Sequence, residues 1–164
     1  MWAAEQGITS GTSATTFSPD APCTRAQTAA FIYRCEQAKG GGFTGAWMFR
    51  LPFTDTPEWA YESIAWCYKE GITSGTSATT FSPDAPCTRA QAVSFLWRAA
   101  GRPTPTSSQM AFTDVAPDSY YRTAVLWAVE NKITSGTSAT TFSPDATCTR
   151  GQIVTFLYRA MGSE

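Results

Sequence analysis

The sequence predicts a mainly α protein, in which tandem helix-loop-helix repeats pack around a pseudo-threefold axis with long ordered loops. Two observations lead to this fold class: a long segment occurs three times, and each copy is flanked by residues with the periodicity of amphipathic helices. Two short helices and a loop cannot bury both apolar faces alone, so the units are expected to pack on one another. With 164 residues, 43% of them hydrophobic, the chain is long enough to form one shared core.

The repeated segment divides the chain into units. Ile8–Gln27 recurs unchanged as Ile72–Gln91 and, with two substitutions, as Ile133–Gln152. A Phe-Thr-Asp sequence precedes the second and third copies, at residues 53–55 and 112–114. We therefore expect a partial first unit without its N-terminal half (residues 1–39), a linker (40–52), a second unit (53–101), a linker (102–111) and a third unit (112–164).

A first helix is expected before the loop of each unit. In the second unit, Ala60, Ile64 and Cys67 share one helical face, and Pro57 suits the first turn. Asp118 is the expected N-cap of the corresponding helix in the third unit. The Gly-, Ser- and Thr-rich segment that follows cannot extend a helix, so we expect an ordered loop in which the Phe residue is an apolar plug.

A second helix begins at each Thr-Arg-Ala-Gln or Thr-Arg-Gly-Gln sequence, which fits a capping box. In this motif the Thr hydroxyl accepts a hydrogen bond from the third helical amide, and the Gln side chain reaches back to the Thr amide. The predicted capping pairs are Thr24 with Gln27, Thr88 with Gln91, and Thr149 with Gln152. After the second box an apolar stripe continues to Gly101, the expected residue just beyond the helix end.

Composition argues against several partners. Twelve Lys and Arg against thirteen Asp and Glu leave a net charge of −1, so no basic field exists to attract nucleic acid. No apolar run approaches the roughly 20 residues that a membrane-spanning helix needs, so no membrane insertion is expected. The five cysteines have no spacing typical of a metal site, and we expect buried free thiols.

Catalysis, a cofactor and a metal are not expected. The chain contains no His, so no Ser, Thr or Cys has the usual base to activate it as a nucleophile. Acidic residues are present, but nothing in the sequence selects two of them at a separation suited to glycoside hydrolysis. We therefore expect a protein that is not an enzyme.

Three arginines are the main candidates for ligand binding. Arg25, Arg89 and Arg150 directly follow the cap residues, where unpaired helix amides and the helix dipole favour an anion. A carboxylate on a glycan would suit such a site, because a guanidinium can bind it through two parallel hydrogen bonds. In the alternative interpretation, each Arg pairs with a loop carboxylate five residues earlier and merely locks the loop. These carboxylates are Asp20, Asp84 and Asp145.

Three loop glycines are further candidates. Gly11, Gly75 and Gly136 could allow the close approach of a sugar, or could supply a positive φ in the turn. Both interpretations remain open at the level of the sequence.

The motifs together resemble the S-layer homology repeat. They occur in the order Phe-Thr-Asp, Gly-Ile-Thr-Ser-Gly, Phe-Ser-Pro-Asp and Thr-Arg-Ala-Gln in the second unit. The resemblance implies a three-pronged helical pseudo-trimer that attaches bacterial surface proteins non-covalently to secondary cell wall polymers, often pyruvylated ones, in grooves between repeats. The family's Thr-Arg-Ala-Glu motif, whose Arg is associated with the acidic glycan, corresponds to residues 24–27, 88–91 and 149–152. Gln replaces Glu in all three copies.

The resulting hypothesis is an extracellular module that binds acidic cell wall polysaccharide at the bacterial surface, with cargo modules upstream or fused. Three linked grooves would raise the residence time on a polymer with repeated acidic groups. The alternative is a structural module that joins protein subunits, including a dimer in which the truncated first unit recruits a helix from a second chain. A glycan-processing enzyme is a third hypothesis.

Overall fold

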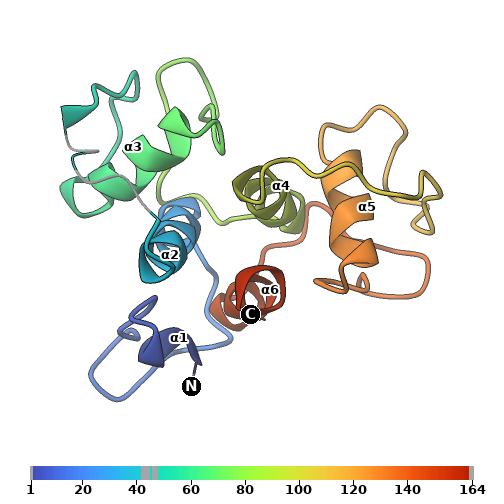
Figure 1. Ribbon diagram of the computed structural model, residues 1–164, viewed down its shortest axis with the longest axis horizontal. Helices are drawn as coiled ribbons and strands as arrows, with labels where there is room; N and C mark the ends of the chain where they lie inside the picture. Colours follow the sequence, from blue (N-terminus) through green and yellow to red (C-terminus); the bar gives the residue numbers. More distant parts are fainter. Residues whose placement is uncertain (1, 42–44, 46–47, 163–164) are drawn as a thin grey trace.

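Three helices, one from each unit, meet at the centre of the molecule (Figure 1). They are α2 (Arg25–Ala38), α4 (Arg89–Ala99) and α6 (Arg150–Met161). The outer helices are α1 (Trp2–Glu5), α3 (Tyr61–Lys69), which follows the 3₁₀ turn η2 (Glu58–Ala60), and α5 (Arg122–Glu130). This helical three-repeat arrangement confirms the predicted fold class. None of the described helices has the length and apolar character needed to span a membrane.

The computed structural model describes residues 2–41, 45 and 48–162. Five residues of the predicted linker 40–52, at 42–44 and 46–47, therefore lie outside the described residues. The second predicted linker is held by side chains on both sides. The Trp97 indole donates to the carbonyl of Pro103 at 2.9 Å, and the Thr106 amide donates to the Glu130 carboxylate at 3.0 Å.

A ring of backbone hydrogen bonds marks the pseudo-threefold axis. The amide of Cys23 donates to the carbonyl of Cys148 at 2.9 Å, Cys87 donates to Cys23 at 2.8 Å, and Cys148 donates to Cys87 at 2.9 Å. All five cysteines are free and buried, as predicted. Burial raises the pKa of Cys87 to about 11 and that of Cys148 to about 12, so these thiols stay protonated at neutral pH. The axis therefore joins the three units through main-chain atoms.

Each outer helix packs on the central helix of the preceding unit. In Figure 1, α3 lies beside α2 and α5 lies beside α4, and these two pairs make extensive contacts. The short α1 meets α6, and the Trp2 and Tyr158 rings make an edge-to-face contact with their centroids 5.3 Å apart. No unit therefore completes its own core, which explains why the repeats fold together.

Local signals correctly predicted the central helices. The Gln27 amide donates to the Thr24 hydroxyl at 3.2 Å, and the Thr24 amide donates to the Gln27 side chain at 3.1 Å. The same reciprocal pair occurs at the start of α4 and α6. Gly101 follows α4 with a φ of +84°, as expected for a residue just beyond a helix end.

The start of the outer helices differs from the prediction. Ala60, predicted to lie on the first helix of the second unit, instead belongs to the turn η2, and α3 starts only at Tyr61. Asp118 does not cap α5, whose N-cap residue is Tyr121 without a side-chain hydrogen bond. The amide and hydroxyl of Ser119 both donate to the carbonyl of Ala116, so Asp118 lies in a separate turn ahead of the helix.

Candidate functional site

The three candidate arginines connect neighbouring units. The Arg25 Nε–H group, at the start of α2, donates to the carbonyl of Phe81 in the second unit at 2.9 Å. The guanidinium also lies over the Phe81 ring, 4.7 Å from its centroid. The equivalent hydrogen bonds join Arg89 to Phe142 at 2.8 Å and Arg150 to Phe17 at 2.9 Å. Each arginine therefore links its unit to the loop of the next unit, and the third links back to the first.

The first amides of the central helices are occupied. The amides of Arg25 and Ala26 donate to the carbonyls of Ala85 and Pro83 at 2.9 and 3.0 Å. The turn of the next unit caps α4 and α6 in the same way. The expectation that unpaired helix amides would hold an anion beside each arginine is therefore wrong, because the neighbouring unit supplies backbone acceptors.

The three arginines do not pair with the loop carboxylates, contrary to the alternative interpretation. Asp84 is exposed, and no guanidinium of the three arginines forms an ion pair within the described residues. The loop is instead held by Asp55, whose carboxylate accepts from the amides of Phe81 and Ser82, both at 2.8 Å. Asp114 holds the third unit's loop in the same way. The Phe-Thr-Asp motif was the sequence signal for these contacts, although their role was not predicted.

The electrostatics of the Asp55 contact follow from its surroundings. Burial acts to raise the pKa of Asp55. The hydrogen bonds from the backbone amides and the positive charge of Arg25 act to lower it, and together they outweigh the effect of burial. The pKa of this carboxyl group is therefore lowered. Burial also lowers the pKa of Arg25, while Cys87, Tyr120 and Asp55 oppose that shift. An arginine keeps its charge at neutral pH even so.

Three grooves lie beside the loops, and each is named here by the unit that supplies its loop. Their volumes are about 530 Å³ for groove 1, 470 Å³ for groove 2 and 490 Å³ for groove 3. Groove 2 combines residues of all three units. It is lined by Thr73–Thr76, Gln91, Ser94, Phe95 and Arg98 of the second unit, Arg25 of the first and Tyr120 of the third.

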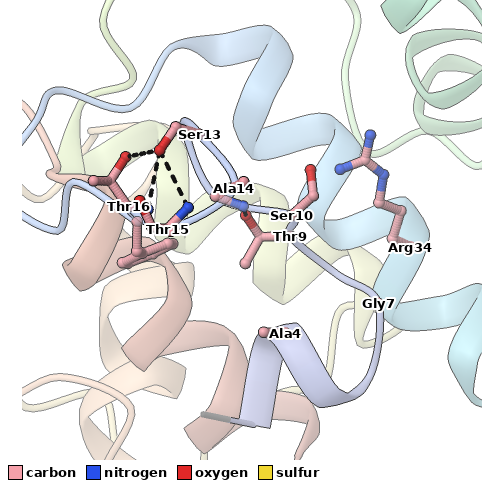
Figure 2. A pocket seen from close by; sticks show the side chains of 11 residues that line it. Ala4, Gly7, Thr9, Ser10, Ser13, Ala14, Thr15, Thr16 and Arg34 are labelled. Atoms are coloured by element: carbon pink, nitrogen blue, oxygen red, sulfur yellow. Dashed lines mark hydrogen bonds between the residues drawn. The ribbon is translucent and has the colours of Figure 1, made fainter.

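The other two grooves share only part of this composition. Groove 3 contains Arg89 of the second unit and Asp20 of the first, around Gly136 and Arg159. Groove 1 contains Gly11 but is not lined by Arg150. Its Arg34 is shown in Figure 2. The structure therefore brings Arg25 together with Gly75 and Arg89 together with Gly136. Arg150 does not line groove 1, although it donates to Phe17 and Thr9, which do.

One nitrogen distinguishes groove 2 from the others. Nη2 of Arg89 donates to the Thr134 hydroxyl at 3.2 Å, and Nη2 of Arg150 donates to the Thr9 hydroxyl at 3.4 Å. Arg25 is only 3% exposed, and its buried Nη2 has no hydrogen-bond partner in the described residues. A buried cationic donor without an acceptor is unfavourable, so groove 2 favours an anionic acceptor.

Each groove also contains an arginine that was not among the candidates from the sequence. Arg34, Arg98 and Arg159 each donate Nη1 to the carbonyl of the Ile at the start of the adjacent loop, at 3.1, 2.9 and 3.0 Å. The signal was available, since each stands nine residues after a candidate arginine. The position of Tyr120 could not be read from sequence, because it reaches groove 2 from another unit.

The loop glycines are required by the fold. Gly11, Gly75 and Gly136 have φ values of +84°, +86° and +84°. A Cβ on Gly75 would lie 2.5 Å from both the Phe53 ring and the Thr80 carbonyl oxygen. The positive-φ interpretation therefore applies to all three, and the same residues also line the grooves.

A comparison with protein families identifies this arrangement. The S-layer homology domain matches residues 1–29, 52–93 and 111–154. The chain belongs to the S-layer homology family. S-layer homology domains are binding modules that anchor proteins to cell wall polymers, and they mark proteins of the cell surface.

One curated relative carries the same domain. The chain is 38% identical over 95 residues to an endoglucanase of Bacillus sp. (strain KSM-635). The match covers 58% of this chain and 10% of the endoglucanase, so the chain corresponds to about a tenth of that protein. Because the match is confined to the S-layer homology region, it gives no support for catalysis by this chain.

Proposed function

We propose that this S-layer homology chain binds a polysaccharide of the cell wall that carries carboxylate groups, such as pyruvyl substituents, and that groove 2 is its principal site. The observation that carries the proposal is the unpaired Nη2 of Arg25, buried beside a groove of about 470 Å³. A carboxylate oxygen accepts from such a nitrogen through a charge-assisted hydrogen bond. Binding therefore removes an unfavourable feature of the free protein.

A second cation supports the choice of an acidic ligand. Arg98 lines groove 2, and no Asp or Glu is among the residues that line this groove. Burial lowers the pKa of Arg98, and the nearby Arg102 adds to that effect. An anion bound in groove 2 offsets this repulsion between cations. In groove 3 the carboxylate of Asp20 lies at the groove wall, which makes that groove less favourable for an anion.

Neutral sugar groups also find partners in groove 2. Ser74 is exposed in the lining of groove 2, and its hydroxyl can donate to or accept from sugar hydroxyls. Tyr120 is 60% exposed and presents an aromatic surface for the apolar face of a pyranose ring. This combination suits an acidic polysaccharide better than a small inorganic anion.

The other candidate residues would act as weaker sites. Arg89 with Gly136 in groove 3, and Gly11 in groove 1, recur around the same axis, so one polymer could engage more than one groove. Linked weak sites raise the overall affinity through effective concentration. The chain would then hold upstream or fused cargo modules at the wall. The match to only 10% of the endoglucanase fits such a modular arrangement.

Binding can be tested by sedimentation with purified bacterial walls, before and after the carboxylate-bearing polymer is removed. Because Arg25 also connects two units, the variants are Arg25→Lys and Tyr120→Ala, with Tyr158→Ala as the matched control, whose side chain is 48% exposed outside groove 2. Loss of a charge-assisted hydrogen bond in Arg25→Lys should weaken binding about 10- to 150-fold. Equal sedimentation with both wall preparations would reject the proposal.

A further inference from the structure

One face of α4 forms a wall of groove 2. Four residues of this helix line the groove, the later ones three, four and seven positions after the first: Gln91, Ser94, Phe95 and Arg98. Such spacings place side chains on one helical face. The Arg25 guanidinium lies over the Phe95 ring, 5.4 Å from its centroid. The guanidinium with the unpaired Nη2 therefore lies against the same face that carries Gln91, about one turn before Phe95.

The capping box fixes the two ends of the Gln91 side-chain amide. The Thr88 backbone amide donates to Oε1 of Gln91 at 3.2 Å. Only the oxygen end can accept from this N–H group, so the NH₂ group occupies the other end. Nε2 of Gln91 has no acceptor among the described residues. It is not buried either, since the buried side-chain atoms without a partner in that part of the chain are Nη2 of Arg25 and the Thr56 hydroxyl. A ligand in groove 2 can therefore accept from it.

The side chain at this position also sets the charge of groove 2. Arg25 and Arg98 are the charged residues that line this groove in the described part of the chain. Tyr120 stays neutral at pH 7, because burial raises its pKa. A Glu in place of Gln91 would cap α4 equally well, since the capping box takes either residue. Gln therefore supplies the cap without placing a negative charge in the groove.

The equivalent glutamines of the other units have different surroundings. Gln27 forms the same capping box at the start of α2, but it does not line any of the three grooves. Gln152 lines groove 3, where the carboxylate of Asp20 is also at the wall. Of the three, Gln91 alone combines, within the described residues, a groove free of carboxylates with an unpaired guanidinium nitrogen.

We propose that Gln91 is a ligand-binding residue that makes groove 2 selective for polysaccharides bearing a carboxylate, an inference that rests on the function proposed above. Its Oε1 caps α4, and its Nε2 donates to the bound anion together with Nη2 of Arg25. The two donors come from different units, and one is neutral while the other is cationic. The residue that starts α4 therefore also recognises the charge of the ligand.

The variant Gln91→Glu tests this role, because it changes one NH₂ group to an oxygen. It keeps the oxygen that caps α4, and a carboxylate near a helix N-terminus is favourable, so Tm should not fall. In groove 2, however, it replaces a donor with a negative charge. Isothermal titration with fragments of a pyruvylated wall polymer should show an affinity at least about 10-fold weaker than that of the unchanged chain.

The matched control is Gln27→Glu. It makes the same chemical change in a capping box outside the grooves, so it should leave the affinity unchanged. A second readout is the pH dependence. The difference between the Gln91→Glu variant and the unchanged chain should narrow as the pH falls from 7 towards about 4.3, the ordinary pKa of Glu, because protonation removes the repulsion. A loss of affinity caused by a damaged helix would not recover in this way.

The outcomes separate this inference from the proposed function. The unchanged chain should prefer the pyruvylated fragments to the same fragments after mild acid has removed their pyruvyl groups. Equal binding of the two preparations would overturn both proposals. A clear preference that Gln91→Glu retains at full affinity would overturn only the role of Gln91. An equal loss in Gln91→Glu and Gln27→Glu would do the same, because the effect would then belong to the capping boxes.

Discussion

Replacing Asp55 with Asn tests how strongly the Phe-Thr-Asp motif holds the loop. Both carboxylate oxygens of Asp55 accept hydrogen bonds, one from the Phe81 amide and one from the Ser82 amide, each at 2.8 Å. Asn keeps one acceptor oxygen and places an NH₂ group where the other oxygen was. One loop amide then faces a donor instead of an acceptor, whichever way the side-chain amide is oriented.

The expected loss follows from that single unpaired amide. Hydrogen bonds to charged groups contribute about 1.5–3 kcal/mol, and the partial exposure of Asp55 reduces the effect through competition with water. We therefore expect Asp55→Asn to lower the free energy of unfolding by about 1–3 kcal/mol. For a protein of this size, that change corresponds to a fall in Tm of roughly 2–12 °C.

Chemical and thermal unfolding followed by circular dichroism would measure the effect. The matched control is Asp84→Asn, because Asp84 is an exposed carboxylate of the same loop and should change stability by no more than about 0.5 kcal/mol. Equal stability of the two variants would show that the Asp55 hydrogen bonds contribute nothing net. The conclusion that Asp55 holds the loop would then be wrong.

Three further outcomes are expected. The pKa values of Asp55 and Asp114 are lowered in the folded state. The stabilisation that these carboxylates give the fold is therefore complete above the unfolded-state pKa of about 3.9, and it is lost as the pH falls through the folded-state pKa values. The double variant Asp55→Asn with Asp114→Asn should flatten the acid denaturation curve. Thiol-reactive probes should label the native chain slowly, because burial raises the pKa of Cys87 to about 11 and that of Cys148 to about 12, and rapid labelling without unfolding would contradict the buried axis. Gly75→Ala should destabilise the chain by about 1–3 kcal/mol, measured by urea unfolding, since a Cβ there meets Phe53 at 2.5 Å and φ is +86°; an unchanged midpoint would refute this reasoning.

Short-range signals predicted the local structure well. The capping box of Thr88 and Gln91 depends on residues three positions apart, so its formation follows from the motif alone. The positive φ of Gly75 is likewise a property of one turn. The start of α5 was predicted less well, because a turn formed by Ser119 and Ala116 competes with the expected cap at Asp118.

Contacts between units account for the rest of the candidate site. Arg25 and Arg89 stand in nearly identical motifs, yet Nη2 of Arg89 has a hydroxyl partner and Nη2 of Arg25 has none in the described residues. The occupied amides at the start of α2 also follow from a neighbouring unit, through the carbonyls of Pro83 and Ala85. Nothing in the motif itself encodes these differences.

Repeat number, helix caps, loop glycines and the family resemblance could all be read from the order of residues, because each depends on neighbours along the chain. Which arginine keeps an unpaired nitrogen and which aromatic ring reaches groove 2 depend on how three units meet around one axis. Hydrogen bonds between units form only where distant segments come within about 3 Å of each other, and that proximity arises only when the units pack together.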